Sequence, residues 1–292
     1  ATATVDSLNP ANQPTHTYLP GIFIQDEIAV NNQNKVLLGM RYDYNSIHGN
    51  IFTPRFNYKW SSKNKENVLR FGLGTGYRVA NVFTEDHAAL TGAREVVLSS
   101  NLNPETSYNG NINYVKNIYT KKDLFIGIDA SAFYTYFNNK IFPDYDTDAS
   151  KIIYDNLSGY AVSQGVSVNY DIVYKDFKIL AGVTAMDVFS VQDGVRERQE
   201  LTEQFTGTWS IGYNFKKNDL SVDYTGNFYS PMDLPTQTTD DFTDPRSAES
   251  PWFSIQNIQL TKKVGDKMEF YGGVKNLLNW TPWKSLNGVP YL

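Results

Sequence analysis

The sequence predicts an all-β protein, a transmembrane antiparallel β-barrel whose strands are exposed to lipid on one face. Three observations predict it. Apolar and polar residues alternate over long stretches, short and long connections alternate between these stretches, and aromatic residues gather near their ends. No stretch shows a convincing helical period, and about twelve strand candidates follow one another along the chain.

The alternation is clearest from Leu124 to Tyr136. The even-numbered residues are all Leu, Ile, Ala or Tyr, whereas the odd-numbered residues include Gly127, Asp129 and Ser131. Successive side chains of a strand point to opposite faces, so one face is apolar and the other tolerates water. Lipid outside a barrel and a polar lumen inside it supply these two environments.

Other segments repeat this pattern. In chain order, they lie near residues 18–30, at 36–45, 52–60, 162–174, 205–215 and 220–228, with a last complete strand at 267–278. Most are longer than the 5 to 6 residues typical of strands in soluble proteins. This length favours a membrane barrel over a soluble β-sandwich or propeller, which remains the alternative.

The connections form two classes that follow each other along the chain. Short ones contain NNQNK, SSKNKEN, TKK, YKD, KKND and VGDK, and long ones cover 81–105, 138–159, 191–203 and 230–250, with a medium one at 45–50. In an up-and-down sheet this order places all tight turns at one end, as in outer-membrane barrels with periplasmic turns and extracellular loops.

The same orientation places both chain ends on the side of the long loops. Complete bacterial barrels have an even number of strands, with both ends normally in the periplasm. We therefore expect residues 1–292 to be a partial barrel domain, cut from a larger barrel.

Aromatic residues near the strand ends favour two girdles at the membrane interfaces. Those near tight turns are Trp60, Tyr119, Tyr174 and Phe215, and those near long loops are Tyr44, Tyr136, Phe228, Trp252 and Trp280.

Composition excludes several classes of protein. A formal charge of −5 without clustered Lys and Arg argues against a nucleic-acid partner. No apolar run is long enough for a membrane-spanning helix, and the absence of Cys removes disulfides and thiolate metal sites. No nucleophile–base or metalloprotease motif is present, so an enzyme is not expected.

Several stretches resemble, in their order and spacing, the C-terminal half of a TonB-dependent outer-membrane receptor, particularly the Bacteroidetes type. These stretches are IFIQDEIAV, KVLLGMRYDYNS, FTPRFNYKWS, GLGTGYRVANVFTEDHAALTGAREVV, NLNPETSYNGNINY, SPWFSIQNIQLTKKV and MEFYGGVKNLLNW. The resemblance implies a barrel of about 22 strands, of which this chain supplies about 12. The plug domain, the TonB-contacting box and a final strand ending in an aromatic residue do not appear here.

The resemblance also implies a function and partners. Such receptors lie in the bacterial outer membrane and import a scarce nutrient, such as a ferric siderophore, haem or cobalamin, with energy transmitted by the TonB complex through the N-terminal part. We expect outer-membrane lipid, the TonB complex and an iron complex, haem or similar small ligand as partners. A passive porin-like channel is the first alternative, and a soluble β-rich binding or adhesion protein the second.

Ligand contacts should come from long loops and strand ends, because these face the extracellular side. Aromatic and guanidinium groups can hold a large planar or catecholate ligand, and carboxylates suit cations. The candidates are Arg78, Asn81, Glu85, His87, Tyr145, Trp280 and Trp283. His87 lies between motifs that resemble those flanking a haem-contacting histidine, but a plain loop histidine is the favoured interpretation.

One loop has the spacing of a calcium site. Oxygen-bearing side chains occupy positions 1, 3, 5, 7 and 12 of the segment 144–155, namely Asp144, Asp146, Asp148, Ser150 and Asp155. Ala149 stands where the turn glycine belongs, and Asp155 replaces the longer Glu, so a solvated acidic loop is favoured over a calcium loop. No other cofactor is expected.

Overall fold

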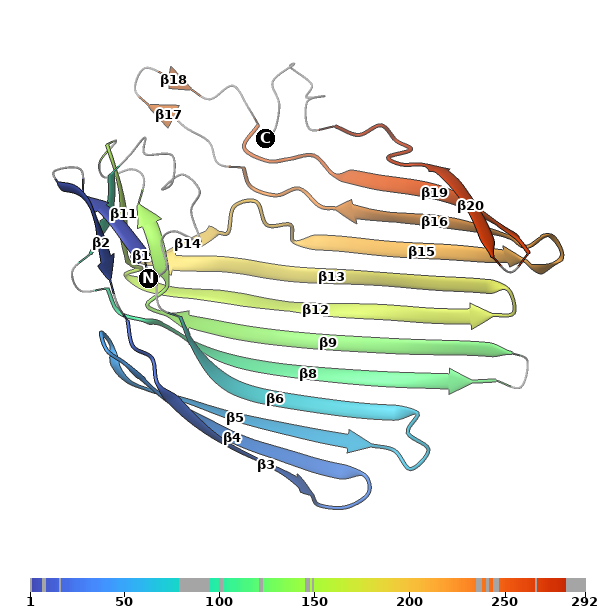
Figure 1. Cartoon of the computed structure of the whole chain (residues 1–292), viewed down its shortest axis with the longest axis horizontal. Coiled ribbons are helices and arrows are strands. Elements are labelled where there is room, and N and C mark those ends of the chain that lie inside the picture. The colour runs from blue at the N-terminus through green and yellow to red at the C-terminus, as the bar shows by residue number, and fades with distance from the viewer. Residues whose placement is uncertain are drawn as a thin grey trace.

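The computed structural model describes residues 2–6, 9–15, 17–78, 95–99, 102–120, 123–144, 148, 150–234, 238–239, 242–243, 247–265 and 267–281. One large antiparallel sheet, called the wall here, organises this part of the chain (Figure 1). Its strands in chain order are β3 (Gly21–Ala29), β4 (Asn34–Asn45), β5 (Gly49–Ser61), β6 (Asn67–Arg78), β8 (Glu105–Tyr119), β9 (Leu124–Asn138), β12 (Gly159–Tyr174), β13 (Phe177–Gln192), β15 (Phe205–Phe215), β16 (Leu220–Tyr229), β19 (Phe253–Val264) and β20 (Met268–Val274).

The remaining elements lie in the connections or precede the wall. A small sheet, the loop sheet, contains β7 (Glu95–Leu98), β10 (Ile141–Asp144) and β11 (Lys151–Asn156). The others are β1 (Thr2–Asp6) paired with β2 (Asn9–Thr15), β14 (Val195–Arg198) paired with β13, β17 (Thr238–Thr239) paired with β18 (Phe242–Thr243), and a 3₁₀ turn, η1 (Lys216–Asn218). No helix in the described part of the chain is long and apolar enough to cross a membrane.

The wall follows the up-and-down order that the alternation of connections predicts. Each strand pairs with its neighbours in the chain, apart from the short strands inserted in the connections. The longest strands, β12 and β13, have 16 residues each and pair without a shift from Gly159–Gln192 to Tyr174–Phe177. This uninterrupted register carries the period-two alternation across the whole sheet.

The register separates two faces, as predicted. The outer face is the one that carries Leu124 and Ile126, which pair with Tyr174 and Ile172 of β12. The inner face is the one that carries Asp129 and Ser131. Many apolar side chains of the outer face are exposed, for example Val166 (53%) and Leu260 (47%), so the wall has no apolar core of its own.

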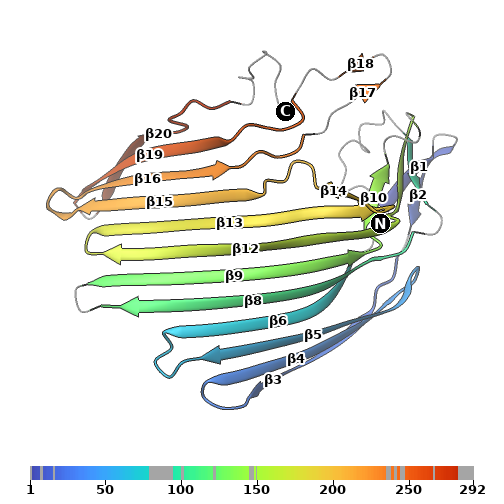
Figure 2. The same cartoon turned by 180° about the vertical axis from the view of Figure 1, so that it is seen from behind.

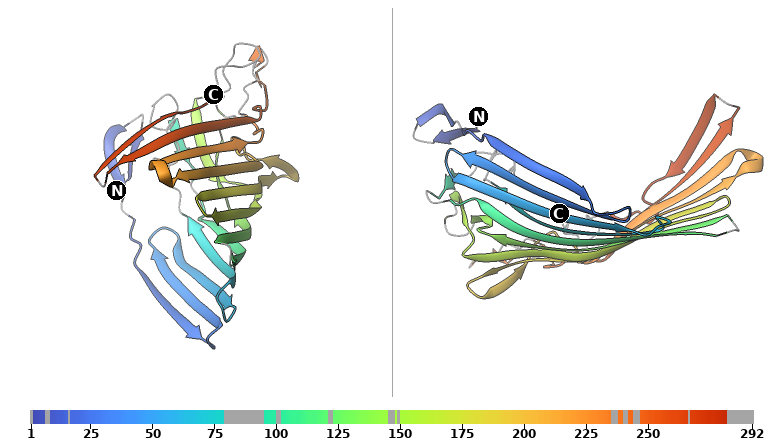
Figure 3. Two further views of the ribbon diagram at one scale, coloured as in Figure 1. Left: turned by 90° about the vertical axis from the view of Figure 1, so that its right-hand side faces the viewer. Right: turned by 90° about the horizontal axis from the view of Figure 1, so that it is seen from below.

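The wall is bent into a trough, which the views from behind and from below show (Figures 2 and 3). Pockets form on concave surfaces, and polar side chains of the inner face line the pockets described below. The inner face is therefore the concave one. β3 and β20 are the two edge strands of this sheet, and each pairs with one neighbouring strand.

Tight turns lie at one end of the trough and longer connections at the other (Figure 1). Two details differ from the sequence prediction. The medium connection between β4 and β5 is a tight turn outside the strands, residues 46–48. The long connection after β13 begins with a hairpin, because Asp193 and Gly194 both have positive φ (51° and 81°), as a type I′ turn requires, and β14 follows.

Most aromatic residues near the strand ends lie on the outer face, as interface girdles would require. Phe205, Phe228 and Trp252 form a cluster there with ring centroids 5.5 to 6.5 Å apart. Two girdle assignments are wrong. Tyr119 packs against Phe125 on the inner face, and Trp280 joins inner-face aromatics, because proximity to a strand end does not fix which face a side chain takes.

Candidate functional site

Most of the predicted ligand-binding residues lie outside the described residues. These are Asn81, Glu85, His87, Tyr145 and Trp283, and nothing tests their role. Arg78 and Trp280 are described, and both lie at the end of the trough that carries the long connections. They belong to opposite parts of the wall, since seven strands separate β6 from β20.

Arg78 is the last residue of β6 and lies directly opposite Glu105, the first residue of β8. Its Nη2 donates to Glu105 Oε2 at 2.8 Å. Glu105 is buried, and the same Oε2 accepts the backbone N–H of Ile141 at 3.3 Å. The carboxylate therefore joins the rim of the wall to the first residue of β10, and part of the Arg78 guanidinium serves this structural contact.

Trp280 lies in a stack of three aromatic rings on the inner face. Its ring packs on Phe253 with centroids 4.2 Å apart and planes 15° apart, and Phe253 stacks in turn on Tyr229 at 4.7 Å and 27°. All three side chains are half-buried. Flat, stacked rings at the edge of a lumen are suited to a planar aromatic or porphyrin-like ligand.

Asn276 fixes the position of Trp280. Its Nδ2 donates to the Trp280 carbonyl at 2.7 Å, and its Oδ1 accepts the Trp280 N–H at 3.0 Å. The Asn276 N–H donates to Asn257 Oδ1 of β19 at 3.0 Å. Asn276, which has a positive φ of 52°, thus anchors the segment after β20 to the wall.

The segment predicted as a calcium loop begins at the last residue of β10 and includes most of β11. Asp148 Oδ1 accepts the N–H and the hydroxyl of Ser150 (2.9 and 2.6 Å), and its Oδ2 lies 3.4 Å from Lys151 Nζ. These hydrogen bonds lower the pKa of the Asp148 carboxyl. Asp155 lies on β11 and accepts the N–H of Asn156 at 2.7 Å.

The other two predicted calcium ligands cannot be placed. Asp146 and the side chain of Asp144 lie outside the described residues. Among the residues that the structure describes, no three His, Cys, Asp or Glu side chains are grouped as a metal site. The calcium loop therefore stays a prediction.

The loop sheet contains a buried apolar cluster that the sequence did not predict. Ile152 is 1% exposed and Tyr154 3% exposed, and they pack with Ile141 against Leu102. β11 runs antiparallel to β10 and parallel to β7, with Lys151 opposite Glu95. The alternation of Ile152 and Tyr154 was the signal that a strand lies here.

Ionic contacts tie the long connections to one another. Arg198 of β14 pairs with Asp233, with its Nε 2.8 Å from Asp233 Oδ2, and reaches Glu249 Oε1 at 3.5 Å. These carboxylates raise the pKa of Arg198, and the Asp233 hydrogen bond contributes most. Lys140 Nζ donates to Gln199 Oε1 at 3.0 Å. Asp233 therefore links two of the long connections.

Comparisons with solved structures place this architecture among iron and siderophore receptors. The FrpB iron transporter from Neisseria meningitidis superimposes with a TM-score of 0.70 and 14% identity, over 90% of this chain and 41% of that one. The siderophore receptor PirA from Acinetobacter baumannii gives 0.66 and 16%, over 90% and 42%. The ferric enterobactin receptor PfeA from Pseudomonas aeruginosa gives 0.64 and 19%, over 90% and 40%.

These likenesses show the fold, and the chain spans about two fifths of the length of each of these proteins. A search of curated protein sequences found no match. The expected fold class, an all-β outer-membrane barrel wall, is confirmed, and the structural neighbours are transport receptors and not enzymes.

The sequence itself identifies the family. Residues 2–277 match the profile described as TonB dependent receptor-like, beta-barrel, which covers nearly the whole chain and includes every strand of the wall. The chain therefore belongs to the family of TonB-dependent receptors, over the β-barrel part.

Proposed function

We propose that the chain forms part of an outer-membrane receptor that binds an iron complex at its extracellular end and imports it with energy supplied through TonB. The family match over residues 2–277 carries this proposal. The names of the structural neighbours, an iron transporter and receptors for siderophores, support iron as the cargo. The alternatives of a passive porin and a soluble adhesion protein find no support in the comparisons.

The two-faced wall supports a place in the outer membrane. An exposed apolar outer face is compatible with hydrocarbon, and a polar inner face with a hydrated interior. The end with the long connections would then face outward, and its loop sheet and aromatic stack would border the entrance.

Ligand binding would use the aromatic stack together with cationic side chains at the rim. Trp280, Phe253 and Tyr229 offer flat apolar surfaces to a planar chelate, such as a catecholate complex or haem. The partly exposed Arg78 guanidinium offers positive charge to an anionic chelate. The other candidates belong, by their position in the sequence, to the long connections or to the segment after the last strand. They are Asn81, Glu85, His87, Tyr145 and Trp283.

Growth and binding measurements test the proposal with the complete natural gene. A strain lacking the gene should fail to take up radioactive iron from one class of ferric chelate, and the gene should restore uptake. Uptake should stop in a strain without TonB, whereas binding at the cell surface should remain. Uptake that continues without TonB would favour a passive channel.

Single substitutions test whether the aromatic stack of Trp280, Phe253 and Tyr229 binds the chelate. We expect Trp280→Ala to weaken chelate binding by roughly two- to tenfold, because a well-packed aromatic contact contributes about 0.5 to 1.5 kcal/mol. Trp252→Ala, which removes a ring from the outer face, is the matched control and should leave binding unchanged. Equal chelate binding by both variants and the parent protein would exclude the aromatic stack as a binding site for the chelate.

A further inference from the structure

Two cations of the wall lie on its outer face. The twelve wall strands contain ten Lys and Arg residues, and the register places eight of them on the inner face. Three of the eight, Lys35, Lys59 and Arg70, line an inner-face pocket of about 440 Å³. The two exceptions are Lys116 of β8 and Lys262 of β19. A cation that faces hydrocarbon is unfavourable, so each exception requires a compensating contact.

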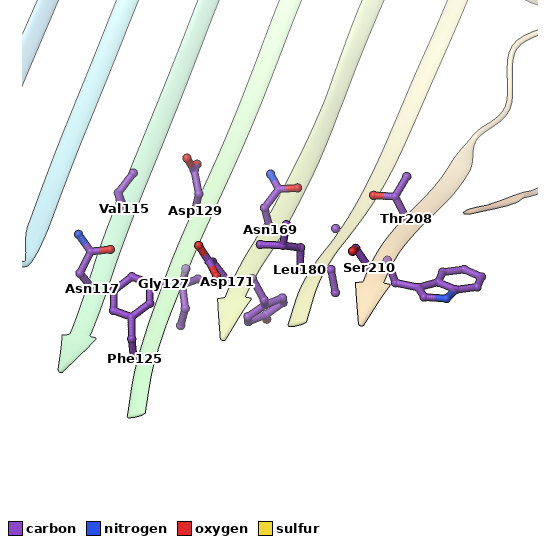
Figure 4. A pocket seen from close by; sticks show the side chains of 15 residues that line it. Val115, Asn117, Phe125, Gly127, Asp129, Asn169, Asp171, Leu180, Thr208 and Ser210 are labelled. Atoms are coloured by element: carbon purple, nitrogen blue, oxygen red, sulfur yellow. The ribbon is translucent and has the colours of Figure 1, made fainter. Parts of the chain in front are cut away.

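The neighbours of Lys116 fix its direction. Val115 and Asn117 line a second inner-face pocket, of about 510 Å³ (Figure 4). Successive side chains of a strand point to opposite faces, so Lys116 points outward. The register agrees, because Lys116 lies opposite Ile128 of the apolar outer face.

The two outer-face cations differ in their contacts. Lys262 Nζ donates to the carbonyl of Asn218, in the adjacent tight turn, which compensates its charge within the protein. Lys116 is exposed and forms no hydrogen bond or ion pair with any residue that the structure describes. Its ammonium group is therefore available to an anion from outside the protein.

Lys116 lies at the level of a membrane–water interface. It is close to the tight-turn end of β8, opposite Asn67, the first residue of β6. On the same face, the Tyr114 hydroxyl donates to Asn67 Oδ1 at 2.8 Å. The Tyr58 hydroxyl donates likewise to Oδ1 of Asn34, the first residue of β4, at 2.6 Å. Tyr rings with their hydroxyls directed toward the strand ends are typical of the interface between hydrocarbon and headgroups.

Asn67 supplies a second donor beside Lys116. Its Oδ1 faces the Tyr114 hydroxyl, and its Nδ2 donates to none of the described residues. Residues directly opposite each other on one face of a sheet have neighbouring side chains. The Lys116 ammonium and the Asn67 amide can therefore hold two oxygens of one phosphate group, and the charge of Lys116 strengthens its hydrogen bond.

Apolar side chains on the long-loop side of this pair favour a lipid over a free anion. Ile112 and Leu73 lie on the outer face there, 46% and 49% exposed. A phosphate held by Lys116 at the interface would place its acyl chains over these two residues. Exposed apolar surface would then contact hydrocarbon, and the headgroup would remain beside the tight turns.

The adjacent tight turn favours a headgroup with a net negative charge. Residues 62–66, which precede β6, contain Lys63 and Lys65, both exposed, and one acid, Glu66. Clustered Lys residues at a membrane surface attract anionic lipids. A zwitterionic headgroup brings its own ammonium group toward these cations, so it gains less.

We propose that Lys116 and Asn67 bind the phosphate of an anionic phospholipid in the leaflet on the tight-turn side, with Ile112 and Leu73 under its acyl chains. The proposal rests on the proposed function, because it needs the outer face of the wall to lie in a bilayer. What it adds is a specific lipid site, the residues that form it and the charge of the headgroup.

Native mass spectrometry of the complete natural receptor measures this binding. The purified receptor is titrated with phosphatidylglycerol or phosphatidylethanolamine of identical acyl chains, and the lipid-bound fractions give the affinities. We expect tighter binding of phosphatidylglycerol. Millimolar inorganic phosphate should not displace it, because the acyl chains contribute to binding. Phosphatidylglycerol with a photoreactive group in its acyl chain should label peptides from β6 and β8.

Substitutions assign the binding to this site. Lys116→Gln should weaken phosphatidylglycerol binding roughly fivefold, equivalent to about 1 kcal/mol, and abolish labelling of β6 and β8. Lys116→Arg should retain both. Asn67→Asp, which places a carboxylate opposite Lys116, should weaken binding at least as much as Lys116→Gln. Lys262→Gln is the matched control on the same face and should change neither measurement. Heat-modifiable electrophoretic mobility should confirm that each variant is folded.

Equal affinity for the two lipids, an equal loss in Lys262→Gln, or displacement by inorganic phosphate would overturn the proposal. Iron uptake by cells that produce the natural receptor separates it from the proposed function. Uptake of a ferric chelate without Lys116-dependent lipid binding refutes only the lipid site. Lys116-dependent lipid binding without uptake of any ferric chelate refutes only the proposed cargo.

Discussion

The wall and the loop sheet are both β-sheets, but they bury their apolar residues in different ways. In the loop sheet, Ile152 and Tyr154 are 1% and 3% exposed and pack against residues of the same small unit. In the wall, Val166 and Leu260 remain 53% and 47% exposed, although each is paired with a neighbouring strand on both sides. One sheet has an apolar core, and the other presents its apolar side chains to its surroundings.

The difference identifies the solvent that each sheet requires. The loop sheet is organised as a small water-soluble protein is, with apolar residues removed from water. The wall satisfies its backbone by pairing between strands, and its apolar face is stable only against hydrocarbon. Substitutions in the buried cluster of the loop sheet and on the apolar face of the wall therefore test this difference directly.

The largest effect is expected in the loop sheet. Ile152→Ala should destabilise it by about 2 to 5 kcal/mol, the usual range for truncating a fully buried Ile. Ile153→Ala, on the neighbouring half-buried position, should have a smaller effect. Limited proteolysis of intact cells should detect faster cleavage in residues 139–158 of the first variant. Equal cleavage of the two variants would show that the cluster does not hold the loop sheet together.

A cation on the outer face of the wall should have the next largest effect. Ala132→Arg should cost about 2 to 4 kcal/mol if the residue lies near the middle of the bilayer. Ser131→Arg, one residue earlier on the inner face, should be tolerated. The measurement is the yield of heat-modifiable folded protein in lipid vesicles, with the complete receptor. A larger loss from Ser131→Arg would reverse the assignment of the two faces.

The wall could be predicted from sequence because its rule is local. In β9 (Leu124–Asn138) and β12 (Gly159–Tyr174), the alternation of apolar and polar residues is enough to assign each side chain to one face. The order of short and long connections then gives the topology. Neither step requires knowledge of which distant residues touch.

The loop sheet and the contacts of the rim could not be predicted in the same way. β11 has six residues, and it pairs in parallel with β7, which lies far earlier in the chain. The spacing of the acidic residues in the same segment suggested calcium ligands. The alternation of Ile152 and Tyr154, which indicates a strand, was therefore not used. Arg78 and Glu105 are opposite each other only because β6 and β8 pair across a long connection, so the sequence indicated Arg78 as a ligand-binding candidate but not its contact with Glu105.

A smaller effect is expected where the two sheets meet. Glu105→Gln removes the charge that holds Arg78 but keeps an acceptor for the Ile141 N–H. We expect a loss of about 1 kcal/mol, because the partly exposed guanidinium can be rehydrated. Hydrogen exchange of the Ile141 amide should accelerate, while amides in the middle of β12 should not change. Faster exchange in both places would mean that Glu105 stabilises the wall itself.

The smallest effect concerns Lys140, which lies beside this junction. Burial lowers the pKa of its ammonium group below the ordinary value of 10.5, the charge of Glu105 partly opposes this shift, and Arg78 adds to it. Between the lowered pKa and 10.5, the unfolded connection binds more protons than the folded one, so the free energy of unfolding rises as the pH rises. Proteolysis of residues 139–158 should therefore slow as the pH is raised from the lowered pKa toward the ordinary lysine pKa. Lys140→Met, measured at each pH with the same protease, removes the titrating group and corrects for the protease's own pH dependence. If the ratio of the two cleavage rates stays constant over this range, Lys140 is hydrated and the junction is more open than the structure shows.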